Sequence, residues 1–534
     1  MPSRPNLEQP LSVPYVLRRP LIVLDLLVRN LQQHRSTTAI AIALLPMFVV
    51  LLFPAGFAAN ESQYFMLAYR KLAPNVFSPF SAAFDESYNR IASQVLMGGA
   101  VDWFGYVGGQ IAMRVVMMLL YAASLAFMLS GIGFSVVESS IALAIYGLVG
   151  PDLMGAEWLF TGVEPKTFAY VFVFVAFGCL WRERIWTATA AMVFATWMHF
   201  LVGGFWVLAM FVLLVLRSGS WQPLPKLLAV YSAGVLPLLA IIVRDMFFAS
   251  EAPIPLPYGL TSSYLYSVIR IPHHSEPFAS AYILGFWVHG IIATIGLSTA
   301  AAVLAVRLSD TPRSAQRALL IWLALLLVYL LVMLGLSAFD TKSGILGEFL
   351  PFRPSALILF FCIVAILLLF SSLADGEIPG LRDGLICATF IVVVPLMLWD
   401  GAKESIKLLT LGSGYTDLQA LIAFIKDNAG EQDIVLTDPQ SDMTPLGADL
   451  PRLIPRPTLV SFKFVPFNPV DISRWWKLLK FRDAVYSGDC PKATDPPVRF
   501  LLYIDRPSHD APGCGQEVWR SEHFMLAEVP SVAQ

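Results

Sequence analysis

The sequence predicts an α-helical membrane protein that crosses the bilayer about eleven times and ends in a small α/β domain. Of its 534 residues, 57% are hydrophobic and only 14% are charged, and the mean hydropathy is +0.67. Soluble domains carry about 25% charged residues, so this deficit indicates a chain that lies largely in lipid. Apolar runs of about 15 to 25 residues recur, the length that crosses about 30 Å of hydrocarbon. The net charge of −2 excludes a basic nucleic-acid-binding surface.

Residues 1–37 are predicted to form a cytoplasmic N-terminal segment. The segment is rich in arginine and lacks a short apolar run followed by a small-residue cleavage site, so it is not expected to be a signal peptide. Within it, Leu21 to Val28 is predicted to form a short interfacial helix on the membrane surface.

Residues 38–400 are predicted to form the membrane domain. We place spans at 38–59, 108–131, 134–150, 167–181, 187–200, 203–216, 226–243, 279–306, 317–338, 355–373 and 383–400. The apolar run from Thr187 to Leu216 is divided in two because His199 and the pair Gly203-Gly204 interrupt it near its middle.

The distribution of positive charge predicts the orientation of these spans. With a cytoplasmic N-terminus, the short inside loops hold most of the arginines and lysines, as the positive-inside rule requires. An odd number of crossings then places the C-terminal part outside the cytoplasm. Cys490 and Cys514 are the only cysteines there, and an oxidising compartment favours a disulfide between them over two free thiols.

Residues 401–534 alternate between helix and strand patterns and predict an extracytoplasmic α/β domain. Leu418 to Ile425 repeats at helical spacing with Asp417 as its cap, and strands are expected at 434–437, 458–464 and 499–504. A helix from Asp471 to Tyr486 lies between the last two. This part contains no phosphate loop, nucleophile elbow or zinc spacing, so we expect it to support the site without supplying catalytic groups.

Candidate functional residues lie in the predicted outer loops 60–107, 151–166, 244–278 and 337–354. Glu61 follows the first span directly and is a candidate catalytic residue. Alternatively, it is only a solvated residue at the end of a helix. Glu164 precedes Pro165, which also suits the start of a helix. Lys166 and Arg353 are candidate substrate-binding residues, or else interfacial anchors.

The stretch Ser262 to Pro277, SSYLYSVIRIPHHSEP, is the most polar of these loops. Its adjacent His273 and His274 should point to opposite faces, because Pro272 favours an extended conformation before it. Two ligands of one metal usually share a face, so binding of an anionic oxygen together with Arg270 is favoured, although a divalent metal remains possible.

Arg114 lies inside the second predicted span. A charge within the bilayer is costly and usually serves a partner or a functional site. Arg114 is therefore a candidate substrate-binding residue, and Asp102 is its predicted partner.

This architecture resembles the GT-C superfamily of integral membrane glycosyltransferases, which has an acidic residue after the first span, surface helices in that loop and a large loop after the seventh span. The resemblance implies a polyprenyl-phosphate sugar as donor, a polysaccharide, lipid or protein acceptor, and Glu61 as catalytic base. If the protein is such a transferase, we expect Arg270, His273 and His274 to stabilise the charge that develops on the leaving phosphate. Family members commonly carry an acidic pair where this chain has Asn60-Glu61, which leaves metal dependence and the identity of the base open.

The strings VEPKTFAY, RIPHH and FRPSAL are similar to segments of bacterial multi-spanning membrane proteins, which implies a bacterial inner membrane. Two other functions remain open. One is a transporter or flippase in which Arg114 and the outer loops line a path, although the sequence has no internal repeat. The other is a non-catalytic assembly protein whose C-terminal domain binds a partner.

Overall fold

The computed structural model describes residues 28, 30–53, 60–73, 90–150, 152–247, 255–307, 314–373, 381–410, 417–442, 444–454, 456–466, 468–492, 496–505 and 514–530. The predicted interfacial helix Leu21–Val28 therefore lies outside the described residues, except for Val28.

Eleven apolar helices stand where the eleven spans are predicted. They are α2 (Thr37–Leu52), α4 (Ile91–Ile132), α5 (Val136–Val149), α6 (Pro165–Trp181), α7 (Ile185–Met198), α8 (Phe200–Ser218), α9 (Leu224–Phe247), α12 (Ala281–Arg307), α13 (Ser314–Asp340), α14 (Ser355–Leu373) and α15 (Leu381–Thr410). In the described part of the chain, 6 helices are long and apolar enough to cross a membrane, and five shorter apolar helices accompany them. The prediction of a multi-spanning α-helical membrane protein is confirmed.

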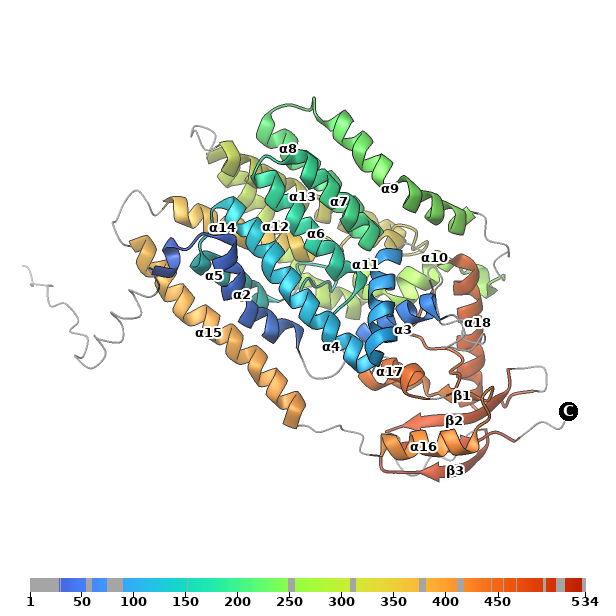
Figure 1. Cartoon of the computed structure of the whole chain (residues 1–534). Helices are drawn as coiled ribbons and strands as arrows, with labels where there is room; N and C mark the ends of the chain where they lie inside the picture. The colour runs from blue at the N-terminus through green and yellow to red at the C-terminus, as the bar shows by residue number, and fades with distance from the viewer. Residues whose placement is uncertain are drawn as a thin grey trace, which may run out of the picture.

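These helices lie side by side in a bundle, with α9 and α15 at opposite edges (Figure 1). Aromatic rings fill part of the core around Phe160. Its ring lies 5.2 Å from that of Tyr121, 5.3 Å from that of Phe48 and 5.3 Å from that of Tyr146, in edge-to-face pairs. The loop that carries Phe160 is thereby packed into the bundle, which matters because the same loop carries functional residues.

The first predicted outer loop contains two helical segments. The first is α3 (Glu61–Leu72), and the second is the beginning of α4, which extends back to Ile91. Gly105 interrupts α4 with φ 70° and ψ 175°, a conformation open essentially to glycine alone. The kink separates the segment before the predicted span from the span itself.

The turn between α7 and α8 consists of His199 alone. The long apolar run is thus divided at the residue where the sequence predicted a division. Gly203 is necessary for this close packing, because a Cβ atom there would lie 2.3 Å from the backbone nitrogen of Thr196. The turn holds the imidazole of His199 at the same end of the bundle as the outer loops.

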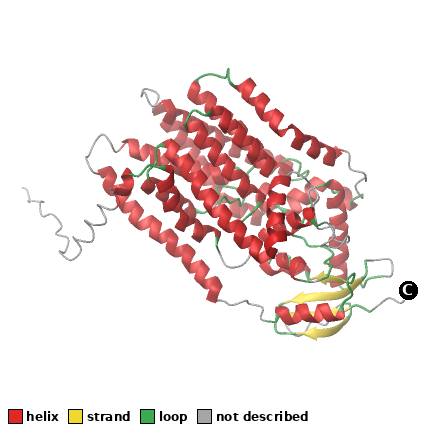
Figure 2. Cartoon of the chain, viewed as in Figure 1, coloured by secondary structure: helices red, strands yellow, loops and turns green. Residues whose placement is uncertain are grey.

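The C-terminal domain has a four-stranded sheet in the order β1-β2-β4-β3, in which β1 and β2 are parallel and the other pairs antiparallel (Figure 2). Its strands are β1 (Ile434–Thr437), β2 (Val498–Ile504), β3 (Gln516–Arg520) and β4 (Phe524–Glu528). Phe500 and Leu502 of β2 pack with α16 (Leu418–Asn428) and α17 (Pro445–Leu453), whereas Leu501 and Tyr503 pack with α18 (Pro469–Tyr486). Alternation along the strand thus places helices on both faces of the sheet.

Three details of the predicted C-terminal domain are wrong. Residues 458–464 form a loop instead of a strand, since side chains bond to its backbone in place of a neighbouring strand: the Asp442 carboxylate accepts from the amide of Phe462 at 3.0 Å. Asp417 makes no capping bond to α16, because its carboxylate accepts a bond from the amide of His523 at 3.1 Å. The strands β3 and β4 were not predicted.

The predicted disulfide between Cys490 and Cys514 is present. It closes the segment that leads from α18 through β2, and it joins the beginning of that segment to the start of β3.

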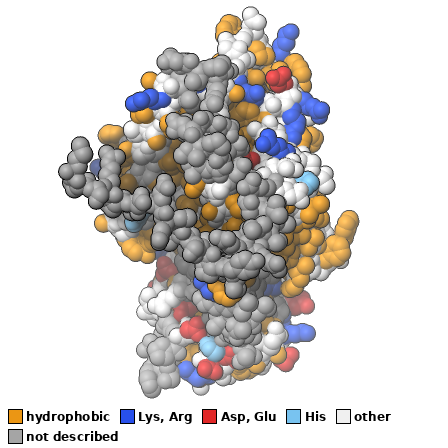
Figure 3. Space-filling view, turned by 90° about the vertical axis from the view of Figure 1, so that its left-hand side faces the viewer, with side chains coloured by type: hydrophobic (Ala, Val, Ile, Leu, Met, Phe, Trp, Pro, Cys, Tyr) orange, Lys and Arg blue, Asp and Glu red, His pale blue; other side chains and the backbone are white. Residues whose placement is uncertain are grey.

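On the face shown in Figure 3, several Lys and Arg side chains gather towards the end away from the C-terminal domain, and hydrophobic side chains show at both sides. The orientation with that end in the cytoplasm stays a prediction from the charge of the loops.

A reporter fused to the C-terminus tests this orientation. Alkaline phosphatase, which requires export, is expected to be active in the fusion, while a green fluorescent protein that folds only in the cytoplasm stays dark. The reverse pattern would contradict the orientation of every span, since all eleven depend on the same count.

Candidate functional site

A polar cavity of about 290 Å³ lies where the predicted outer loops meet the C-terminal domain. All four outer loops and the turn at His199 contribute to its wall. The titratable side chains on this wall are Arg90, Glu157, Glu164, Lys166, His199, Arg270, His273, His274, Glu348, Arg353 and Lys463. Five lysines and arginines face three carboxylates, so the wall is electropositive and suits an anionic ligand.

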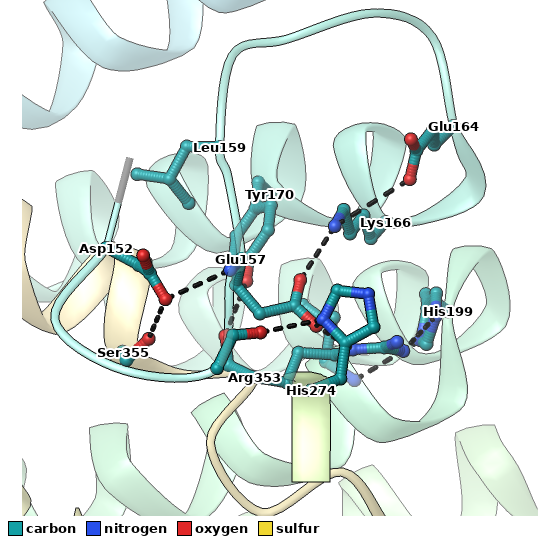
Figure 4. Close-up of polar contacts among 12 residues, drawn as sticks. Asp152, Glu157, Leu159, Glu164, Lys166, Tyr170, His199, His274, Arg353 and Ser355 are labelled. Carbon is teal, nitrogen blue, oxygen red and sulfur yellow. Dashed lines mark hydrogen bonds and ion pairs between the residues drawn. The ribbon is translucent and has the colours of Figure 1, made fainter. Parts of the chain in front are cut away.

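Glu157 is the centre of the charged cluster (Figure 4). Its Oε2 lies 2.7 Å from Nζ of Lys166, and its Oε1 lies 3.1 Å from Nε of Arg353 and 3.8 Å from Nδ1 of His274. Burial raises the pKa of Glu157, but the attraction of Lys166 and Arg353 prevails and lowers it to about 2. Glu157 is therefore a permanent anion that fixes the position of two cations.

The loop that presents Glu157 is held by a bond within the loop and by close packing against the fourth outer loop. Asp152 accepts a bond from the Glu157 amide at 3.0 Å, and burial raises the pKa of Asp152 to about 6. Gly155 has φ +89°, and a Cβ atom there would lie 2.8 Å from Cβ of Phe352. Glycine at this position lets the second outer loop approach the fourth closely enough for Glu157 to reach Arg353.

Arg353 joins Glu157 to the turn between α7 and α8. Its Nη1 lies 2.9 Å from Nε2 of His199, and burial holds the pKa of His199 well below its usual value, with Arg353 adding to the effect. His199 is thus neutral at neutral pH. Since a guanidinium only donates, Nε2 is the accepting nitrogen of the ring.

Lys166 and Glu164 flank the start of α6. The ammonium of Lys166 lies 3.7 Å from the centre of the Trp158 ring and 3.7 Å from Oε2 of Glu164. Glu164 caps the helix by accepting from the amide of Thr167, with Pro165 at the first helical position. Burial raises the pKa of Glu164, and Glu157 adds to the rise. Glu164 is therefore both the predicted helix start and part of the cavity wall.

His273 and His274 lie on the same wall of the cavity, contrary to the prediction that they point apart. Pro272 begins the short helix α11 (Pro272–Ser275), so the backbone is not extended, and the two ring centres are 4.1 Å apart. Nδ1 of His274 donates to the carbonyl of Gly155 at 2.7 Å. Burial lowers the pKa of His273 to about 4 and that of His274 to about 3. Both rings are neutral at neutral pH, so His273 can offer one N–H group to the cavity, while the second ring nitrogen of His274 is an acceptor.

The divalent metal that the sequence left open at the two histidines is not favoured by these side chains. Within the part of the chain that the structure describes, no three His, Cys, Asp or Glu side chains are grouped to hold a metal ion. His274 uses one ring nitrogen for Gly155, so the histidine pair offers fewer free nitrogens than its sequence suggests.

Glu61 and Arg114 form a buried ion pair outside the cavity. The Glu61 carboxylate is 0% exposed and accepts from Nε of Arg114 at 3.1 Å, from the amide of Val163 at 2.6 Å, and from Gln110. A general base must reach the proton that it removes, and this carboxylate neither lines the cavity nor has a free face. The catalytic role predicted for Glu61 does not fit this geometry, nor does the substrate-binding role of Arg114. Asp102, the predicted partner of Arg114, is exposed on α4.

Lys463 is the cavity residue of the C-terminal domain that sequence reasoning missed; Arg90, Glu157, His199 and Glu348 were not among the predicted site residues either. It comes from the C-terminal loop 456–466, and Nη2 of Arg270 donates to its carbonyl at 2.8 Å. The only sequence signal was a single lysine within the apolar string LVSFKFV.

A second, largely apolar pocket of about 290 Å³ adjoins the cavity. The two share Phe200, Leu201, Phe349, Leu350 and Arg353 in their walls, and aromatic residues of α6, α8 and α13 line the remainder of the apolar pocket. A polar, electropositive space thus borders an apolar one, with Arg353 between them.

Asp340 organises the backbone of the fourth outer loop, and Glu276 of the third outer loop is buried near it. Asp340 accepts from the amides of Ile345, Leu346 and Gly347 at 3.1, 2.7 and 3.1 Å. Glu276 is fully buried beside it, and burial together with Asp340 raises the pKa of Glu276 to about 8. Glu276 is therefore largely protonated at neutral pH.

Comparisons with known proteins place this chain in no family. No family model matches it, and no curated protein matches it. Among solved structures, it is similar to a crystal structure of ArnT from Cupriavidus metallidurans bound to undecaprenyl phosphate, with a TM-score of 0.42 and 13% identity over 96% of this chain and 99% of that chain. At this level the match is a likeness of overall architecture, and it supports no inference about activity, substrate or residues.

Proposed function

We propose that this protein is a membrane glycosyltransferase. It transfers a sugar from a polyprenyl-phosphate donor to an acceptor at the outer face of a bacterial inner membrane. One observation carries the proposal: Arg353 lines both the electropositive cavity and the adjoining apolar pocket. This arrangement suits an anionic head group attached to an apolar chain.

In the proposed complex the donor phosphate lies beside Arg353 and Lys166, and the first isoprene units enter the apolar pocket. Both cations are already fixed by Glu157 at 3.1 Å and 2.7 Å. They therefore require little reorganisation when negative charge grows on the leaving phosphate. The neutral His273 adds a ring N–H donor on the same wall, whereas the single N–H of neutral His274 is bonded to the carbonyl of Gly155.

Glu164 is the proposed general base in place of Glu61. Its carboxyl lines the cavity, and its raised pKa makes it a better proton acceptor than Glu157, which two cations hold as a weak base. The acceptor hydroxyl attacks the anomeric carbon and gives its proton to Glu164. The bond between that carbon and the phosphate oxygen breaks, and its electron pair leaves with polyprenyl phosphate. A single displacement of this kind inverts the anomeric carbon.

The transporter alternative loses the residue on which it was based. Arg114 is paired with Glu61 and does not line either pocket. The assembly-protein alternative gives no reason for a buried cluster of charges around an internal cavity.

Replacing Arg353 with methionine tests the proposal. We expect the affinity for undecaprenyl phosphate, measured with the full-length protein in nanodiscs, to fall about 10- to 100-fold, because charge-assisted hydrogen bonds to the phosphate are lost. Arg353→Lys keeps the charge but not the planar fork, so an intermediate loss is expected.

Arg317→Met is the matched control, since Arg317 is exposed on α13. Undecaprenyl phosphate binding that is absent from the wild-type protein, or unaffected by Arg353→Met, would refute the proposed donor site.

A further inference from the structure

The C-terminal domain supplies one wall of the cavity through the loop that carries Lys463. This loop is fixed at several points. Nε1 of Trp475 donates to the carbonyl of Ser461 at 2.9 Å, and Nη2 of Arg270 donates to the carbonyl of Lys463 at 2.8 Å. Phe464 is buried against α3 of the first outer loop. The Lys463 side chain is consequently held in place and is only 7% exposed.

Arg270 and Lys463 differ from Arg353 and Lys166 because neither has a carboxylate partner within the described part of the chain. Arg353 and Lys166 each contact Glu157. Among the residues that the structure describes, neither Arg270 nor Lys463 has a carboxylate within 4.0 Å. Nε of Arg270 is also buried without a hydrogen-bond partner in this part of the chain. Burial of a charge without a partner is unfavourable, so a ligand that brings negative charge would be stabilised there.

We propose that Arg270 and Lys463 form a second anion subsite, which binds an oxyanion group of the acceptor. The assignment to the acceptor rests on the proposed function: a polyprenyl phosphate carries one phosphate, and the apolar pocket places that phosphate on the Arg353 side. The second anionic group then belongs to the other substrate, which reaches the cavity along the wall that the C-terminal domain builds. The subsite selects acceptors that carry a phosphate or a similar oxyanion near the hydroxyl that reacts.

The electrostatic environment of Lys463 also favours a bound anion. Burial lowers the pKa of Lys463 to about 8, and Arg270 adds to this effect, while Glu164 and Asp449 oppose it only in part. An anion between Arg270 and Lys463 would favour the protonated amine and raise its pKa again.

The test uses the full-length protein in nanodiscs with two probes, inorganic phosphate and undecaprenyl phosphate. Binding of each is titrated through the thermal stabilisation that it produces. Lys463→Met is expected to weaken phosphate binding by about 10-fold or more and to leave undecaprenyl phosphate binding within about 2-fold of wild type. Lys463→Arg keeps the charge and is expected to retain phosphate binding.

A pH series adds an independent measurement. Phosphate binding by the wild type should decline as the pH rises past about 8, where Lys463 loses its proton, whereas Lys463→Arg should show no such decline. Arg270, Glu164 and Asp449 face Lys463, and of these Arg270 keeps its charge throughout this range.

Two results would overturn the subsite. One is a Lys463→Met variant that binds inorganic phosphate as tightly as the wild type does. The other is an equal loss of affinity for both probes, which would place Lys463 at the donor phosphate. A wild-type protein that does not bind undecaprenyl phosphate would be a different result. It would refute the proposed function and leave the phosphate subsite intact.

Discussion

Glu164→Gln is expected to lower the turnover number for sugar transfer by about 10²- to 10⁴-fold, the usual effect of losing a general base. The amide keeps the size of the side chain, and its oxygen still accepts the capping bond from Thr167 that begins α6. It cannot take a proton from the acceptor. The measurement is turnover at saturating donor, together with the melting temperature in nanodiscs, which should change little.

Glu138→Gln is the matched control for this change. Glu138 also lies at a helix start, in the capping box that Ser135 opens for α5, and it does not line the cavity. Turnover in Glu138→Gln should therefore equal that of the wild type. If Glu164→Gln retains wild-type turnover, another group accepts the proton and the assignment of Glu164 is wrong.

Glu61→Gln is expected to destabilise the protein by about 3–5 kcal/mol, the cost of leaving a buried charge without its partner. The amide would present an N–H group where Arg114, Gln110 and the Val163 backbone all donate. The helices α3 and α4 and the loop before α6 meet at this carboxylate, so they should loosen together. Denaturation in detergent, followed by tryptophan fluorescence, measures the change.

Two controls separate this effect from a general sensitivity of α4. Asp102→Asn changes an exposed carboxylate on the same helix and should leave stability unaltered. The double variant Glu61→Met with Arg114→Met removes both charges, and it should recover most of the loss because no uncompensated charge remains. A fully stable Glu61→Gln with low turnover would instead restore Glu61 as a catalytic residue.

The spans were predictable because length and hydropathy determine them directly. Each helix of the bundle coincides with a predicted run, and His199 marks the division between α7 and α8. Residues 458–464 misled the prediction because their apolar pattern is typical of a strand. Their apolar side chains are buried, yet their backbone bonds to the side chains of Trp475, Asp442 and Arg270, which lie 14, 20 and 193 residues from their partners in the sequence. Local pattern does not contain that information.

The candidate site was predictable in its location and less so in its roles. The predicted topology places four loops on the same side of the membrane. Glu164, Lys166, Arg270 and Arg353, which come from three of these loops, do line one cavity. The role of Glu61 was not predictable from its position after the first span. It depends on Arg114, whose side chain enters the same buried space only because α4 runs beside α3.

The cavity wall extends in sequence from Asn60 to Val465, and this has a consequence for biosynthesis. At about 5–20 residues per second, roughly 20 to 80 seconds separate the synthesis of the first wall residue from that of the last. Once Arg353 has been made, about 110 residues remain before Lys463, so for roughly 5 to 20 seconds the chain carries Lys166, Arg270 and Arg353 without the wall that holds Lys463. A ribosome-bound chain therefore lacks the complete cavity, and the proposed activity is expected only after the C-terminal domain has docked.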